Sequence, residues 1–204
     1  MISKKKENAV RSLVSLYTVV IGVALSVSVV TLVDPRVGLS AVTAGSMLLF
    51  GAFVATLLPF YHGALRHLDD AYLENESTQI RDGALIVDFL LLFFHAMAFV
   101  VLALLLHRPS DFAWVLITVL TIDVLWAIFT YFASSSAAPG GAEGKWGFIN
   151  LMFVGVAVIY LMNQGIYFGT GRPDDAKIAV PIFVFAVIRT VVDYVWCRKF
   201  YFPP

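Results

Sequence analysis

The stretch from Ala84 to Leu106 places the tightest limit on what this chain can fold into. It holds 23 residues, of which only Asp88 and His95 are ionisable. A run this long and this apolar is typical of a helix that crosses a membrane. The two side chains are seven positions apart, so they lie about 20° from each other around such a helix, on one stripe. Because a charge inside hydrocarbon costs roughly 2.5–3.5 kcal/mol on insertion scales, both residues need a partner or a function.

The rest of the chain repeats this apolar pattern. Hydrophobic residues make up 60% of the 204 residues, with a mean hydropathy of +0.86, whereas a soluble domain is about half apolar. All spans should be helices, because an open sheet leaves backbone groups unpaired in lipid. We predict a single all-α domain, residues 1–204, with six transmembrane helices at about 12–33, 39–60, 84–106, 112–133, 147–168 and 177–197.

Lysine and arginine favour one orientation of these spans. If the N-terminus is cytoplasmic, the inner segments carry nine Lys and Arg residues and the outer loops carry four. Cytoplasmic loops normally carry this excess. The sequence therefore predicts a multi-pass protein of the plasma (inner) membrane with both termini in the cytoplasm. The inner residues are Lys4, Lys5, Lys6, Arg11, Arg66, Arg81, Lys145, Arg198 and Lys199, and the outer ones are Arg36, Arg108, Arg172 and Lys177.

The second span is rich in small residues. Ala41 and Gly45, and then Gly51 and Ala55, are four positions apart, a spacing that lets two helix backbones approach closely. Packing inside the bundle is one interpretation of this pattern. An interface between subunits of a homo-oligomer is the other.

Polar side chains recur inside the spans at two depths. Counting from the span ends puts one group near the middle of the membrane and the other in the inner leaflet. We predict that spans three, four and six turn these side chains toward a shared interior. The first group is His95 and Asp123, and the second is Asp88, Asn150, Arg189 and Asp193.

The charges in this set do not balance. Three aspartates face one arginine, together with His95 if it is protonated. One carboxylate therefore lacks a counter-charge and is expected to carry a proton, because removal from water favours the neutral form. The alternative is that the whole set is a structural network that holds the helices in register.

Residues 61–82 are predicted to extend the second span into the cytoplasm as a helix. The segment carries a polar set that is a candidate surface for a cytoplasmic protein partner. A metal site there is disfavoured, since its two histidines are five positions apart and not the four that place two on one helical face. The set is His62, Arg66, His67, Asp69, Asp70 and Glu74.

Several kinds of chemistry find no support. The formal net charge is zero, so nucleic-acid binding is not indicated. The single cysteine, Cys197, excludes a cysteine-rich metal site. No two histidines share a depth suited to haem, and no glycine-rich phosphate loop or nucleophile motif is present. We therefore expect no cofactor and no metal, and an enzyme is the weakest of the functional hypotheses.

Two functions remain. The first is a small channel or transporter-like protein for protons or a small ion. Here His95 and Asp123 act as a midplane relay, and Asp88, Arg189 and Asp193 form an inner gate, since histidine titrates near neutrality. The second is a membrane-embedded sensor or assembly partner that uses residues 62–82, with the intramembrane charges structural. In both cases the surroundings are the lipid bilayer.

Overall fold

The computed structural model describes residues 4–33, 36, 38–74, 82–133, 142–167 and 175–203, and the secondary structure in these ranges is helical. Six of the helices are long and apolar enough to cross a membrane, as the sequence predicts. The elements are α1 (Lys4–Val33), the 3-10 helix η1 (Gly38–Ala41), α2 (Ala44–Asp69), the π-helix η2 (Asp70–Glu74), α3 (Asp82–Leu104), α4 (Pro109–Ala133), α5 (Ala142–Asn163), α6 (Asp175–Trp196) and α7 (Arg198–Tyr201).

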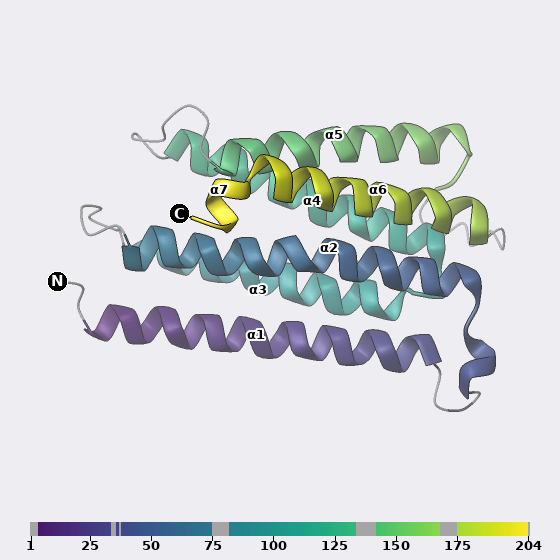
Figure 1. The fold of residues 1–204 in the computed structure, drawn as a ribbon, viewed down its shortest axis with the longest axis horizontal. Coiled ribbons are helices and arrows are strands. Elements are labelled where there is room, and N and C mark those ends of the chain that lie inside the picture. The colour runs from purple at the N-terminus through teal and green to yellow at the C-terminus, as the bar shows by residue number, and fades with distance from the viewer. Residues whose placement is uncertain are drawn as a thin grey trace.

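The six long helices run side by side along the long axis of the molecule (Figure 1). They pack mainly as three pairs, α1 with α3, α2 with α6, and α4 with α5. The start of α1 and the short helix α7 lie at the same end of the bundle, which we call the terminal end; the opposite end is the far end (Figure 1). The chain therefore traverses the bundle an even number of times.

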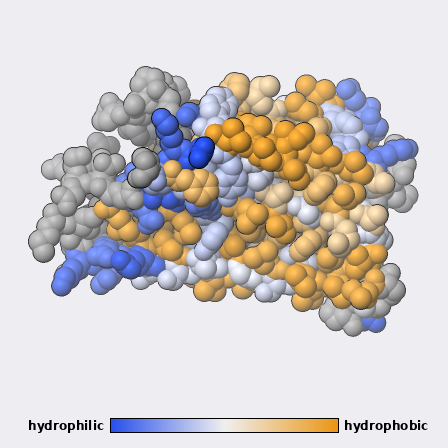
Figure 2. All heavy atoms as spheres, in the orientation of Figure 1, coloured by the Kyte–Doolittle hydropathy of each residue, from blue (hydrophilic) through white to orange (hydrophobic). Residues whose placement is uncertain are grey.

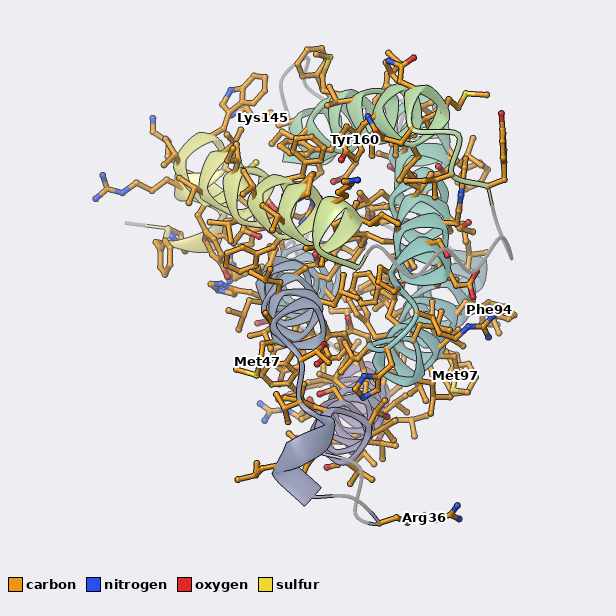
Figure 3. All side chains as sticks on the ribbon, turned by 90° about the vertical axis from the view of Figure 1, so that its right-hand side faces the viewer. Arg36, Met47, Phe94, Met97, Lys145 and Tyr160 are labelled. Carbon is orange, nitrogen blue, oxygen red and sulfur yellow. The ribbon has the colours of Figure 1, made fainter. Side chains whose placement is uncertain are left out.

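The outer surface of the bundle is apolar. Met47 points outward from α2, and Phe94 and Met97 point outward from α3 on the opposite side (Figure 3); their exposed fractions are 50%, 65% and 43%. On the face seen in Figure 2, hydrophobic residues form a broad band, with hydrophilic residues toward the two ends. Large exposed apolar surfaces are unusual on soluble proteins. This surface is compatible with an integral membrane protein.

The second long helix begins at Ala44, five residues later than the predicted boundary at 39. Thr43 caps it: its hydroxyl accepts from the Ser46 backbone N–H at 3.0 Å, and the Ser46 hydroxyl accepts from the Thr43 backbone N–H at 2.9 Å. This reciprocal capping box satisfies two backbone donors at the helix start. Ala41 belongs to η1, so Ala41 and Gly45 do not form a spaced pair on one helix.

Gly51 provides a close approach between α2 and α6. A Cβ atom at this position would lie 2.7 Å from Cε2 of Phe183, far inside van der Waals contact. Glycine is therefore needed here for the packing of the α2–α6 pair. This contact supports the interpretation of the second small pair, Gly51 and Ala55, as packing inside the bundle.

The helix continues past the apolar part of the second span, to Asp69, and then through the π-turns of η2 to Glu74. The rest of the predicted extension, from 75 to 81, and with it Arg81, lies outside the described residues, as does Arg172. This continuation of the helix places His67 and Tyr72 alongside α3, where they form part of the site described below.

Candidate functional site

A partly open cavity, lined by apolar and titratable side chains, lies where the three helix pairs meet. Its volume is about 50 Å³ for the centres of water-sized molecules. One water molecule needs about 10–15 Å³ on this scale, so the cavity has room for a few water molecules. The cavity lies in the terminal half, because many of its residues come from the turns of their helices nearest the terminal end (Figure 1). Its titratable lining residues are Tyr17, His67, Asp88, His95, Asp123, Arg189, Asp193 and Tyr201.

Asp88 is held by donors from three elements. His67 Nε2 of α2 lies 3.0 Å from its Oδ2, and the Tyr72 hydroxyl of η2 donates to the same oxygen at 2.6 Å. The Trp126 indole N–H of α4 donates to Oδ1 at 3.3 Å. The side chains of His67 and Asp88 are 13% and 12% exposed. This cluster joins three helices, one from each of the three pairs.

A second set of contacts runs from α4 through α5 to α6. The Asn150 amide N–H₂ donates to Oδ2 of Asp123, and the Asn150 oxygen accepts from Arg189 Nε at 2.7 Å. Arg189 Nη2 lies 4.0 Å from Asp193 Oδ2, and the Tyr201 hydroxyl donates to that oxygen at 3.0 Å. Residue counting predicts Asp88 at the level of Arg189. In the structure, however, Asp88 belongs to the first cluster and not to this second set, because α2 and η2 bring His67 and Tyr72 next to it.

His95 lies between the two sets. Its Nδ1 is 2.9 Å from the carbonyl oxygen of Leu91. Because a carbonyl only accepts hydrogen bonds, Nδ1 carries the proton and Nε2 presents a lone pair in the neutral ring. The residue is 4% exposed and lines the cavity together with Asp123, with which it interacts electrostatically. The structure thus brings His95 and Asp123 to one cavity.

Five cavity-lining residues have a buried polar atom without a hydrogen-bond partner in the described part of the chain. The atoms are His95 Nε2, Asp193 Oδ1, Arg189 Nη1, Trp146 Nε1 and the Tyr17 hydroxyl. Buried polar groups are nearly always paired, so an unpaired one requires an explanation. Two of the atoms are donors, two are acceptors and the Tyr17 hydroxyl is both. Together they can bind water or a small polar species in the cavity.

The C-terminal segment closes the terminal side of the site. Arg66 Nε donates to the carbonyl oxygen of Phe200 at 3.2 Å, and the Phe200 ring packs edge-on against Trp146 at 4.7 Å. Burial, together with the charge of Asp193, raises the pKa of the Cys197 thiol to about 12 and also raises the pKa of the Tyr201 phenol. Both groups therefore stay neutral at physiological pH.

The predicted partner surface on residues 62–82 is partly engaged within the chain. His62 packs against the rings of Tyr201 and Phe202, at 4.9 and 5.5 Å between centroids. Arg66 and His67 bind Phe200 and Asp88, as described above. Asp69 and Asp70 are partly exposed at the terminal end, and the side chain of Glu74 lies outside the described residues.

The aromatic residues of the site are not among the candidates predicted from the sequence. Tyr17, Tyr72, Trp126, Trp146 and Tyr201 line the cavity or bind its carboxylates. Most lie near span ends, where aromatic residues ordinarily mark the membrane interface. Their hydroxyl and indole donors, at the same depth as Asp88, were the signal that could have linked them to the acidic residues.

Metal binding has no visible site in the described ranges: no group of three or more His, Cys, Asp or Glu side chains is placed to hold an ion. Comparison of the chain with protein-family models, with curated proteins and with solved structures gives no match. Its function is therefore inferred from the geometry and chemistry of the cavity, since a fold alone does not imply a function.

Proposed function

We propose that this protein moves protons or another small ion across a membrane, and that the cavity holds the ion inside the bilayer. The observation that carries the proposal is the convergence of Asp88, Asp123 and Asp193 on one cavity, whose lining residues hold five unpaired polar atoms. Ionisable residues within membrane spans ordinarily mark ion pathways or proton relays.

Aromatic residues separate the cavity from the far end. The Phe60 ring packs against Phe99 at 5.4 Å between centroids, and Phe99 packs against Phe53 at 6.0 Å. Phe53 and Phe99 are fully buried. We propose that this barrier opens by relative movement of the helix pairs, since packed elements have few discrete arrangements.

The terminal end is proposed to be cytoplasmic, following the excess of Lys and Arg in the inner segments. The ion then enters the cavity from the cytoplasmic side or leaves toward it. Arg66 and the segment around Phe200 lie at this mouth. Their contacts would have to loosen for exchange with the cytoplasm.

The experiment is a flux measurement with purified protein in liposomes that contain a fluorescent dye selective for the ion under test. Proton, sodium and potassium gradients are imposed one at a time. We expect flux of one of these ions, and a loss of at least tenfold in Asp123→Asn, which keeps an acceptor for Asn150 but removes the charge. Asp111→Asn is the control, since Asp111 pairs with Arg108 away from the cavity, at 2.6 Å. Absence of flux for all three ions would overturn the proposal and favour the regulatory alternative.

A further inference from the structure

We infer that the species held in the cavity is the proton, and that Nε2 of His95 is the atom that takes it up and gives it back. This inference rests on the proposed transport function and names its substrate. It also assigns His95 a different role from a relay that passes a proton from one ring nitrogen to the other.

The pairing of charges in the cavity leaves one place for a cation. Asp88 pairs with His67 at 3.0 Å, and Asp193 lies 4.0 Å from the guanidinium of Arg189. Asp123 is hydrogen-bonded to the neutral amide of Asn150. With the three carboxylates ionised and His67 protonated, the described lining is one positive charge short, and protonation of His95 supplies that charge near Asp123.

The geometry of His95 fixes which nitrogen can react. Nδ1–H donates to Leu91 within the same helix, at 2.9 Å, and this bond persists whether the ring is neutral or charged. Nε2 is buried, has no partner among the described residues and belongs to a residue that lines the cavity. A proton from a hydronium ion in the cavity adds to the Nε2 lone pair, which forms imidazolium and leaves water.

Release must reverse this step at the same atom. The new Nε2–H bond breaks, the electron pair stays on nitrogen, and water in the cavity accepts the proton. Because Nδ1–H remains hydrogen-bonded to the Leu91 carbonyl, the ring has no second nitrogen from which to release the proton. Net transport therefore requires the cavity to change the side to which it opens between uptake and release, which is alternating access.

A metal cation suits the cavity less well than a proton. Hard cations bind through several oxygen ligands, whereas His95 offers nitrogen and one Asp123 oxygen is already taken by Asn150. The unpaired Oδ1 of Asp193 belongs to a carboxylate whose other oxygen lies 4.0 Å from the guanidinium of Arg189. The guanidinium of Arg189 also stands in the lining, 5.0 Å from the centre of the Phe60 ring. It keeps its charge at all relevant pH values and repels a second cation.

The charge on His95 depends on groups from every helix that carries a titratable lining residue. α1 contributes Tyr17, α2 contributes His67, α3 contributes Asp88 and α4 contributes Asp123. α6 contributes Arg189 and Asp193, and α7 contributes Tyr201. Of these, Asp123 is the acidic group that forms no ion pair among the described residues, and both His95 and Arg189 act on it electrostatically. Its variant is therefore the most informative companion to one at His95.

The first test is ¹⁵N NMR of histidine-labelled protein in lipid, with the His95 signal identified by its loss in His95→Gln. We expect the neutral ring to carry its proton on Nδ1, and Nε2 to gain one on acidification. Asp123→Asn should shift this transition to lower pH. A neutral ring with its proton on Nε2 would overturn the inference, and this readout does not require a functional variant.

The second test is flux through His95→Gln, with His107→Gln as the matched control. His107 is also a histidine, but it binds the Thr31 carbonyl at 2.8 Å outside the cavity. We expect proton flux to fall at least tenfold in the first variant and to be unchanged in the second. Flux of sodium or potassium without protons, or full proton flux in His95→Gln, would overturn the inference while leaving transport intact. Absence of all flux would overturn both proposals.

Discussion

Thr190 of α6 donates a hydrogen bond to the backbone carbonyl of Ala55 in α2, at 2.6 Å. Ala55 lies four residues before Pro59, which has no N–H, so this carbonyl has lost its helical partner. The same arrangement recurs in α6, where Pro181 frees the carbonyl of Lys177 and the Tyr160 hydroxyl donates to it at 2.6 Å. In each case a hydroxyl on a neighbouring helix replaces the missing bond, which is the arrangement that a helix in lipid would require.

Replacing Thr190 by valine should destabilise the protein by about 0.6 kcal/mol, the average measured for hydrogen bonds between membrane helices, and by no more than about 1.7 kcal/mol, the largest such value. The loss should shrink toward zero in a Pro59→Ala background, because residue 59 then donates to Ala55 itself. Unfolding by SDS in mixed micelles measures both values as a double-mutant cycle. Equal losses in the two backgrounds would contradict the pairing of Thr190 with the proline-freed carbonyl.

Gly51→Ala should destabilise the α2–α6 pair by about 1–3 kcal/mol, as overpacking does in cores. The added Cβ would lie 2.7 Å from the Phe183 ring. Gly155→Ala in α5 is the control, since no atom lies within 4 Å of its Cβ position. The control should be neutral or slightly stabilising, because alanine favours helix. A Gly51→Ala variant that unfolds like the control would contradict the close approach.

Asp88→Ala should cost about 3–5 kcal/mol, typical of breaking a buried ion pair from one side. It leaves the donors of His67, Tyr72 and Trp126 without their shared acceptor. Glu7→Ala provides the comparison: Glu7 pairs with Arg11 on the surface at 2.7 Å, with 40% of its side chain exposed. Exposed pairs of this kind contribute about 0.5 kcal/mol or less. Similar losses for the two variants, measured by the same unfolding assay, would argue against a buried cluster.

The Cys197 thiol should react slowly with maleimide in the folded protein. A pKa raised to about 12 leaves roughly a thousandfold less thiolate at pH 8 than an ordinary cysteine has, and thiolate is the reactive form. The side chain is also 2% exposed. Labelling should be at least a hundredfold slower than in the SDS-unfolded chain, and should accelerate as pH rises.

Arg66→Ala tests what holds the C-terminal segment over the thiol. It removes the hydrogen bond to the Phe200 carbonyl and the contact with the Phe200 ring. Labelling of Cys197 should then become faster at every pH. Fast labelling already present in the unaltered protein would show that the segment does not cover the thiol.

Residue counting groups polar side chains by depth but does not predict their partners. It predicts Asp123 and His95 at one depth, and in the structure both line one cavity. The bond from Asn150 that links Asp123 to Arg189 was not predicted, because counting along a helix says nothing about which neighbour stands beside it. The contact of His67 with Asp88 was not predicted for the same reason. His67 lies in a polar segment, and such a segment is typical of a helix face exposed to solvent.

The sequence by itself determined that the chain forms six long apolar helices and that Asp88 and His95 share one stripe. Both are local properties: hydrophobic length and helical period depend on neighbouring residues, and lipid leaves the backbone few alternatives. Only the tertiary structure decided the rotation of each helix and the choice of its partner. That choice depends on contacts such as Gly51 with Phe183 and Thr190 with Ala55, which join residues more than 130 positions apart. In the arrangement that results, Asp88 contacts His67, Asp193 lies near Arg189, and Asp123 lines one cavity with His95.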